Sequence, residues 1–400
     1  MNLALASKPQ GLCLKDLPRA HVDALYVHVP FCFHKCHYCD FYSITRQTPQ
    51  RMAHFVDLVL REAEMWSDRD VVRPRTIFFG GGTPTLLPIE QMQRLLEGLR
   101  DQFDLTQVIE WTVEANPATV TREYCEMLRR SGVDRISFGA QSFDHAELTT
   151  LERHHNPDDV PRSIELARQA GFERLNLDLI YAIPGQTMDS WSQSLERAIE
   201  LRTDHLSCYG LTYEPNTPIA VRRRLGLLHP VEESRELDML HHTRRRLAAC
   251  GFAPYEISNY ARPGQECLHN LVYWTGGNYI GLGPSAASHI EGWRWRNRPH
   301  LGEWESAVAD ADLPAIETEQ LDARHRAKEL AWLMLRLSRG LIYAEFTART
   351  GLDARALWNE KVKHLTACGL VLADDRGFRL SERGIPVADA VAAELMDASH

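Results

Sequence analysis

Short apolar segments alternate with amphipathic segments over the first 250 residues of the chain. The apolar segments are rich in β-branched and aromatic residues, as β-strands are. They are residues 25–31, 76–80, 109–114, 135–138, 174–181 and 206–212. The amphipathic segments have a helical period and are residues 49–66, 89–100, 122–130, 159–169, 190–201 and 232–249. This order predicts a parallel sheet with right-handed crossovers, either open and doubly wound or curled into a barrel.

Residues that can bind a ligand or take part in chemistry follow the predicted strands. They are Cys32, the Gly-Gly-Gly-Thr-Pro turn at 80–84, Glu114, Gln141, Asp178 and the pair Tyr213-Glu214. Each lies at or near the carboxyl end of a strand. In parallel sheets and in barrels alike, that edge carries the active site. We therefore expect one site that is assembled from several strand ends.

The second half of the chain has a different pattern. Residues 255–316 are rich in Gly, Asn, Trp and Tyr and have little helical period, which predicts loop and short strand facing a ligand. Helical segments follow at 324–338, 344–350 and 354–368. The turn 374–377 between two apolar runs predicts a hairpin, and a last helix follows Ser381. Helices with a hairpin suggest a small winged-helix-like domain.

The charge balance narrows the class of function. Lys and Arg number 45 against 54 Asp and Glu, a net charge of −9, which argues against a nucleic-acid partner. No apolar run approaches the roughly 18 residues of a membrane span. The first ten residues also lack the pattern of a signal peptide. We expect a cytoplasmic protein with no transmembrane segment.

Three of the nine cysteines lie within eight positions, as Cys32, Cys36 and Cys39. In a reducing compartment such crowding indicates metal or redox chemistry. Three thiolates need a fourth ligand to close a tetrahedral zinc site, but they can hold three irons of a [4Fe–4S] cluster and leave the fourth iron open. The alternative is a zinc site of three cysteines with His34 or His37.

The C-x3-C-x2-C spacing, with an aromatic residue before the last cysteine, resembles the radical S-adenosylmethionine (SAM) superfamily. Residues 26–41 further resemble the oxygen-independent coproporphyrinogen oxidase group and, within it, the HemW heme chaperones. The resemblance extends over about residues 24–395 and includes the segments 80–84, 137–143, 176–186 and 269–274. In this superfamily the open iron is chelated by SAM, whose reductive cleavage yields a 5′-deoxyadenosyl radical.

The resemblance implies a partial (β/α)6 radical SAM barrel with an appended winged-helix-like C-terminal domain. The expected parts are an N-terminal segment 1–23, the barrel 24–254, a heme- or substrate-facing extension 255–316 and the C-terminal domain 317–400. It also implies a SAM pocket. The expected contacts are Tyr26, Tyr38, Gly81, Gly82, Thr83, Glu114, Gln141, Arg153, Asp178 and Thr212.

The glycine turn and the two strand carboxylates of this pocket can also be explained without a ligand. Exposed amides in the glycine turn before a helix favour a carboxylate, although a tight turn alone would explain the glycines. Glu114 and Asp178 lie in apolar strands, where an ion pair with Arg135 or Arg174 is the alternative.

The segment His269-Asn270-Leu271-Val272-Tyr273-Trp274 matches the H-N-x-x-Y-W pattern of the HemW family and implies contact with heme. A histidine is a competent axial ligand, and aromatic rings can stack on a porphyrin. The alternatives are a hydrogen-bonded loop histidine among core aromatics, or Cys267 as a thiolate ligand.

Phe41 stands two residues after Cys39, where the coproporphyrinogen dehydrogenases carry a further cysteine. This departure favours a heme chaperone that binds heme, a [4Fe–4S] cluster and SAM and delivers heme to acceptor hemoproteins. The alternative is an oxygen-independent coproporphyrinogen III dehydrogenase; whether SAM is cleaved stays open. A DNA-binding regulator conflicts with the net charge of −9. The family also suggests a homodimer.

Overall fold

The structure is a computed structural model that describes residues 12–67, 69 and 71–396. The chain divides into two compact units. Of the described residues, those within 12–33, 42–111 and 277–322 belong to the first unit, and those within 34–41, 112–276 and 323–396 belong to the second. Among the residues described, no helix has both the length and the apolar character that crossing a bilayer requires.

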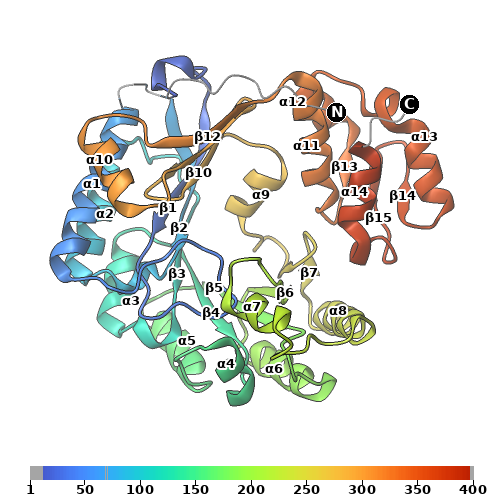
Figure 1. Ribbon diagram of the computed structural model, residues 1–400, viewed down its shortest axis with the longest axis horizontal. Coiled ribbons are helices and arrows are strands. Elements are labelled where there is room, and N and C mark those ends of the chain that lie inside the picture. The colour runs from blue at the N-terminus through green and yellow to red at the C-terminus, as the bar shows by residue number, and fades with distance from the viewer. Residues whose placement is uncertain (1–11, 68, 70, 397–400) are drawn as a thin grey trace. The chain divides into compact units, whose positions relative to one another are not determined.

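The first unit is built on a mixed sheet. In spatial order its strands are β12 (Ala315–Gln320), β11 (Trp293–Asn297), β10 (Ala287–Ile290), β9 (Tyr279–Leu282), β1 (Val22–Val29) and β2 (Val72–Gly81). Strand β1 pairs in parallel with both β2 and β9, whereas β10, β11 and β12 pair antiparallel. Its helices are α1 (Pro49–Ser67), α2 (Ile89–Gln102) and α10 (Leu301–Ala309), which lie together on one side of the strands (Figure 1).

The parallel strands of the second unit continue the predicted alternation. In spatial order the sheet contains β3 (Glu110–Ala115), β4 (Arg135–Gln141), β5 (Arg174–Tyr181), β6 (His205–Gly210), β8 (Asn259–Ala261) and β7 (Ala253–Pro254). Strands β3 to β6 are parallel, and β8 is antiparallel to β6. All six predicted strands form. Strand β5 has the predicted ends, and at least one end of each of the other five is shifted.

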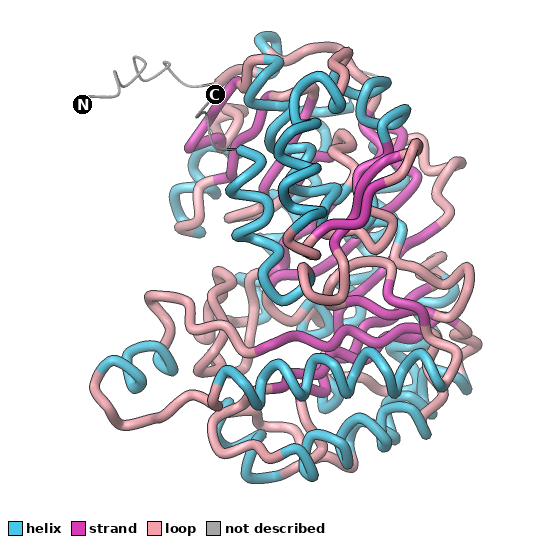
Figure 2. Tube along the Cα trace, turned by 90° about the vertical axis from the view of Figure 1, so that its right-hand side faces the viewer, coloured by secondary structure: helices cyan, strands magenta, loops and turns pink. Residues whose placement is uncertain are grey.

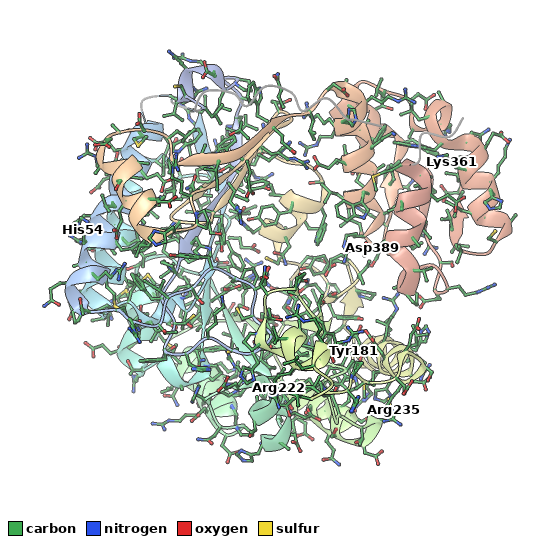
Figure 3. All side chains as sticks on the ribbon, in the orientation of Figure 1. His54, Tyr181, Arg222, Arg235, Lys361 and Asp389 are labelled. Atoms are coloured by element: carbon green, nitrogen blue, oxygen red, sulfur yellow. The ribbon has the colours of Figure 1, made fainter. Side chains whose placement is uncertain are left out.

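Helices connect the strands of the second unit along the outer side of its sheet (Figures 1 and 2). They are α3 (Arg122–Arg130), α4 (His145–Leu151), α5 (Asp159–Gln169), α6 (Met188–Glu200), α7 (Pro218–Arg224) and α8 (Glu233–Ala249). The six helices predicted for the two units are confirmed as α1, α2, α3, α5, α6 and α8. Helices α4 and α7 were not predicted. Tyr181 at the end of β5 packs on Trp191 of α6, with ring centroids 5.6 Å apart (Figure 3).

The C-terminal part of the second unit has its own core. Its elements are α11 (Ala323–Leu335), β13 (Leu341–Ile342), α12 (Tyr343–Thr350), α13 (Ala354–Ala367), β14 (Val371–Ala373), β15 (Gly377–Leu380) and α14 (Ala388–Met396). The predicted helices and the predicted β14–β15 hairpin are confirmed. Phe346 and Trp358 pack edge to face at 5.4 Å in this core. Single-turn 3-10 helices elsewhere are Leu14–Asp16, Pro84–Leu86, Pro117–Thr119 and Ile385–Val387.

The expectation of loop and short strand for residues 255–316 is partly wrong. Short strands do form there, but the region also contains α9 (Leu268–Trp274) and α10, and β9 is an integral strand of the sheet. Helix α10 buries Leu301, Trp304 and Val308, whose spacing is helical. Helices this short carry too little period to be predicted, because tertiary packing supplies most of their stability.

A buried carboxylate links three elements of the first unit. Glu62 of α1 is inaccessible to solvent and accepts hydrogen bonds from Gly283 N at 2.8 Å, Asn297 Nδ2 at 2.7 Å and Trp304 Nε1 at 3.0 Å. Burial raises the pKa of Glu62 to about 8, and the three donors oppose the rise. The helix α1 is thereby fixed to the β9 turn, to β11 and to α10.

Glu62→Gln tests this buried acid. Because the pKa of Glu62 is about 8 in the folded protein and near 4.5 otherwise, the folded state binds more protons between these values, so stability falls as pH rises. We expect the difference in unfolding free energy, wild type minus variant, to decrease by up to about 1.4 kcal/mol per pH unit from about pH 5 to 8. Denaturant unfolding measures it. Glu64→Gln, exposed on the same helix, should show no trend; a flat difference for Glu62→Gln would contradict the expectation.

Candidate functional site

The cysteine loop begins directly after β1. Cys32 N donates to Ile44 O at 3.0 Å, and Cys32 Sγ lies 3.8 Å from Thr83 Oγ1. Cys32 belongs to the first unit, and Cys36 and Cys39 belong to the second. None of the three cysteines forms a disulfide, and all three are partly exposed. The loop therefore presents three accessible sulfur donors within eight residues.

In the second unit, the segment Leu151-Glu152-Arg153 after α4 holds the cysteine loop. Leu151 O accepts from His37 N at 3.1 Å, and Arg153 Nη1 lies 3.7 Å from Cys36 Sγ. The Glu152 carboxylate lies 3.2 Å from His34 Nε2 and also contacts His37 Nε2. Both loop histidines therefore contact one carboxylate through Nε2, an arrangement that is also found for metal-bound histidines, so the zinc alternative stays open.

The donor chemistry of the loop fits an iron–sulfur cluster. Thiolates are the ligands that such clusters prefer, and a cation beside a thiolate stabilises its charge. Arg153 provides that cation next to Cys36. Over the part of the chain that is described, no three His, Cys, Asp or Glu side chains converge as metal ligands do. The fit therefore rests on three soft donors with a neighbouring guanidinium, not on a preformed cage.

The glycine turn is packed against the chain that follows β1. A Cβ on Gly82 would lie 2.7 Å from both Val29 O and Phe31 O. Gly82 N donates to Val29 O at 2.8 Å, and Thr83 N donates to Phe31 O at 2.7 Å. The expectation of exposed amides is wrong for Gly82 and Thr83, because carbonyls of β1 and of the chain just after it accept from them. Gly81 has a φ of +100°, and a Cβ there would meet the ring of His28 at 2.4 Å.

Tyr26 is oriented by a buried histidine. Tyr26 Oη lies 3.1 Å from His28 Nδ1, and His28 Nε2 lies 2.9 Å from Tyr42 O. The carbonyl of Tyr42 can only accept, so Nε2 carries the proton and Nδ1 accepts from the tyrosine hydroxyl. Burial lowers the pKa of His28 to about 4, which keeps the ring neutral. The Tyr26 hydroxyl is thus held at the end of β1 by residues of the first unit.

Asp178 is held by hydrogen bonds rather than by either of the expected arginines. Its carboxylate accepts from Asn176 Nδ2 at 2.8 Å and from Ser137 Oγ at 3.3 Å. Arg174 instead pairs with Asp134 at 2.6 Å, and Arg135 donates to the carbonyls of residues 265 and 266. The ion-pair alternative is therefore wrong for Asp178. Burial raises the pKa of its carboxyl group.

Other expected SAM contacts of the second unit lie near the same strand ends. Gln141 is buried with a φ of 64°, and Arg153 Nη2 donates to Gly139 O at 2.6 Å. Tyr38 packs against the apolar residues around Ile180, and burial raises its pKa while the Arg153 cation opposes the rise. Arg153 opposes the rise at Asp178 too, so these three side chains lie within electrostatic range. Glu114 is half-buried, and Thr212 is exposed after β6.

The H-N-x-x-Y-W segment forms helix α9 rather than a loop. This places His269 and Tyr273 one turn apart, with His269 Nε2 2.8 Å from Tyr273 Oη. His269 is fully buried, whereas Asn270, Tyr273 and Trp274 are half-buried. Arg336 stacks over the Trp274 ring at 5.3 Å. A ligand that takes the Nε2 lone pair of His269 must therefore displace the Tyr273 hydroxyl.

Sequence reasoning missed several residues of this site. Glu152 sits beside Arg153 in a charged, helical stretch, so its role was indistinguishable from a solvated surface charge. His28 and His205 had a usable signal, because a histidine within an apolar strand must find a buried partner. Tyr255 lies in a region without a helical or strand period and gave no signal.

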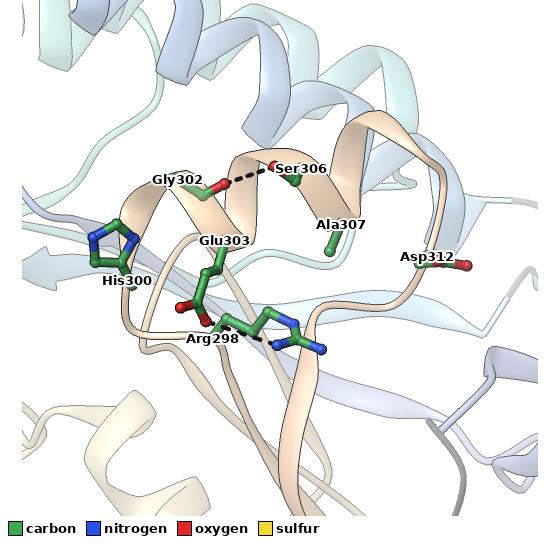
Figure 4. Close-up of a pocket in the computed structure, with 7 residues that line it drawn as sticks. All are labelled: Arg298, His300, Gly302, Glu303, Ser306, Ala307 and Asp312. Atoms are coloured by element: carbon green, nitrogen blue, oxygen red, sulfur yellow. Dashed lines mark hydrogen bonds and ion pairs between the residues drawn. The ribbon is translucent and has the colours of Figure 1, made fainter.

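A pocket of the first unit lies along α10, and none of the expected site residues lines it (Figure 4). It is lined by Arg298, His300, Gly302, Glu303, Ser306, Ala307 and Asp312. Arg298 pairs with Glu303 at 3.7 Å, and Ser306 Oγ donates to Gly302 O at 2.9 Å. The polar groups of this pocket are largely engaged with one another.

Comparison with known proteins gives consistent matches. Residues 26–198 match the Radical SAM superfamily, and residues 321–387 match the HemN C-terminal domain. Heme chaperone HemW of Lactococcus lactis is 33% identical over 92% of this chain and 96% of its own length. Heme chaperone HemW of Mycobacterium tuberculosis is 38% identical over 93% of this chain and 94% of its own length.

Among solved structures, coproporphyrinogen III oxidase (HemN) from Escherichia coli is similar with a TM-score of 0.82. The two chains are 24% identical, and the match covers 94% of this chain and 91% of the other. At this identity the likeness is evidence for the fold. It confirms the predicted class, an α/β fold with a radical SAM barrel-like parallel sheet and a C-terminal domain.

Each cysteine of the loop can be tested separately. We expect Cys32→Ser, Cys36→Ser and Cys39→Ser each to lower bound iron from about four per chain to less than about one after anaerobic reconstitution, because each removes one thiolate ligand. Iron and sulfide analysis measures the loss. Cys368→Ser, which removes an exposed thiol elsewhere, is the matched control. Unchanged iron in all three variants would contradict the assignment.

Proposed function

The chain belongs to the HemW family of the radical SAM superfamily, and from that premise we propose that it is a heme chaperone. It binds heme, a [4Fe–4S] cluster and SAM, and it delivers heme to acceptor hemoproteins. The observation that carries the proposal is the match to HemW relatives over more than nine-tenths of both chains. The residues of the cysteine loop and of α9 support it.

Cys32, Cys36 and Cys39 would hold the cluster, which together with SAM supplies one-electron chemistry when bound. The surrounding side chains hold the loop. Glu152 binds both loop histidines, and Arg153 donates toward Cys36 Sγ at 3.7 Å. Partners of this kind orient the ligands and stabilise negative charge on sulfur.

The SAM-binding role of the strand-end residues remains part of the proposal. Asp178 offers a carboxylate that Asn176 and Ser137 orient, and Arg153 offers a cation nearby. Gly82 supports this role by allowing close approach of the backbone, not by offering its amide. In the first unit, Tyr26 offers a hydroxyl that His28 fixes. In the second unit, the proposed contacts thus include a carboxylate and a cation, which suit the two charges of a zwitterionic ligand.

Heme binding uses α9 in this proposal. His269 offers an imidazole for the iron, and the half-buried Tyr273 and Trp274 offer aromatic surface for the porphyrin. Because His269 is buried and bound to Tyr273 Oη at 2.8 Å, heme binding includes rotation of Tyr273 away from it. The buried state keeps the imidazole protected until heme arrives.

The E. coli coproporphyrinogen III oxidase shares the fold, so the fold does not separate a chaperone from a porphyrinogen enzyme. The residue after the cysteine loop supports the chaperone. Phe41 is 64% exposed at the position where the resemblance expects a further cysteine in the dehydrogenases. A cytoplasmic location and a homodimer also remain proposals. None of the nine cysteines, all of which lie in the described part of the chain, forms a disulfide, which favours a reducing compartment.

Heme binding is the first test of the proposed function. We expect hemin, titrated anaerobically into cluster-loaded protein, to saturate near about one equivalent and to give a Soret band. His269→Ala should weaken binding by about tenfold or more and shift that band, because the axial ligand is lost. His54→Ala, an exposed histidine on α1 (Figure 3), is the control and should bind as the wild type does.

An absence of saturable hemin binding by the wild type would overturn the chaperone proposal. Product formation from coproporphyrinogen III with SAM and a reductant would then become the assay for the alternative enzyme. If hemin binding is saturable but His269→Ala leaves it unchanged, the chaperone proposal stands and the assignment of His269 as the iron ligand is wrong.

The role of Arg153 can be measured as a reduction potential. The Arg153 cation lies beside Cys36 Sγ and stabilises the extra electron of a reduced cluster. We expect Arg153→Met to lower the midpoint potential of the cluster by roughly 60 mV, which is a tenfold change in the equilibrium constant of a one-electron reduction. Arg153→Lys keeps the positive charge and should have a potential close to that of the wild type. Redox titration followed by electron paramagnetic resonance, without SAM, measures the shift. Equal potentials in wild type and Arg153→Met would contradict this role.

A further inference from the structure

A continuous line of hydrogen-bonded side chains runs through the second unit from β5 to α9. Asn176 Nδ2 donates to Asp178 Oδ1 at 2.8 Å, and Asn176 Oδ1 lies 2.6 Å from His205 Nδ1. On the other side of the ring, His205 Nε2 lies 2.9 Å from Tyr255 Oη. Asn270 Nδ2 then donates to Tyr255 Oη at 3.4 Å. We call Asp178, Asn176, His205, Tyr255 and Asn270 the relay.

The proton positions in the relay follow from its two amides. Asn176 presents its oxygen to His205, so His205 Nδ1 carries the proton and Nε2 accepts from the hydroxyl of Tyr255. The Tyr255 oxygen accepts in turn from Asn270. Every bond therefore donates in one direction, from Asn270 toward the carboxylate of Asp178. Bonds aligned in this way polarise one another.

The middle of the relay is buried. Asn176 and His205 are buried, and burial lowers the pKa of His205 well below its usual range, which keeps the ring in this single neutral form. Tyr255 is half-buried, and its ring packs against His205 with centroids 5.5 Å apart. Because a buried polar group that loses its partner costs free energy, a change at one end favours a rearrangement of the hydrogen bonds along the relay.

The two ends of the relay are the functional ends of the proposal above. Asp178 faces the proposed SAM pocket, and Asn270 follows His269 on α9. Helix α9 lies on the opposite side of the β5 and β6 strands from α5 and α6, so it meets the face of the sheet that carries the relay (Figure 1). Asn270 and His269 are neighbours in one turn of a seven-residue helix, so a shift of the backbone at Asn270 also shifts His269.

We infer that His205 and Tyr255 are positioning residues that couple occupancy of the SAM pocket to the state of the heme-binding helix. The inference rests on the proposed function, which assigns Asp178 and α9 to those ligands. A hydrogen-bond donor of the ligand competes with Asn176 for the carboxylate of Asp178. This competition changes the strength of each hydrogen bond along the relay. The change reaches Asn270 and alters how readily α9 releases His269. Coupling of this kind is reciprocal, so heme must change SAM affinity by the same factor.

The test measures that factor in the full chain. SAM affinity is determined by anaerobic titration calorimetry on cluster-loaded protein, with and without saturating hemin. In wild type we expect the two dissociation constants to differ by about fivefold or more. In Tyr255→Phe, which removes only the hydroxyl shared by two relay bonds, the ratio should fall to about one while each ligand alone still binds.

Tyr260→Phe is the matched control, because Tyr260 is a buried tyrosine of β8 outside the relay. It should keep the wild-type ratio. An undiminished ratio in Tyr255→Phe, or a ratio of one in wild type that binds both ligands, overturns the inference and leaves the chaperone function standing. Failure of wild type to bind hemin instead overturns the proposed function.

A second measurement tests the relay without heme. Hydrogen exchange of residues 268–274 is followed by mass spectrometry before and after SAM is added to cluster-loaded protein. We expect SAM to change exchange in α9 by about fivefold or more in wild type and Tyr260→Phe, and not in Tyr255→Phe. A wild-type α9 that SAM leaves unchanged overturns the coupling. Thermal unfolding of each variant verifies that it is folded.

Discussion

Parallel pairing of β1 with β2 is the constraint on which the start of the site depends. It brings the backbone after β1 so close to the next strand end that Gly82 N and Thr83 N bond to Val29 O and Phe31 O. A side chain at position 82 would collide with those carbonyls at 2.7 Å. The glycine turn is thus a structural requirement of the strand pair, and the cysteine loop leaves the sheet from a fixed point.

Hydrogen bonds and ion pairs to buried and half-buried polar groups fix the positions of the site residues in the second unit. The segment Leu151-Glu152-Arg153 offers a carbonyl, a carboxylate and a guanidinium to the loop that carries Cys36. On the sheet, Asp178 is held by neutral donors instead of an arginine. A carboxylate with neutral partners remains available to a charged or hydroxyl-bearing ligand, whereas a closed ion pair would already be neutralised. This arrangement suits a binding pocket.

In the proposed function, helix α9 must both bind heme and release it. His269 is buried and bound to Tyr273, so on this proposal it must be uncovered before it can bind the heme iron. The relay gives that opening a physical link to a second site, because Asn270 is the point at which α9 meets the polar line through Tyr255. Regulation would then require no large movement, only a change in which groups share protons.

The sequence by itself determined the order of strands and helices, the hairpin and the three clustered cysteines, because apolar period and residue spacing are local properties. It misassigned α9 and α10 and the amides of the glycine turn, since short helices and strand contacts are decided by packing. Only the tertiary structure chose the partner of each polar group. His205 meets partners 29 and 50 residues away in the chain, and no local pattern records which distant side chains a fold brings together.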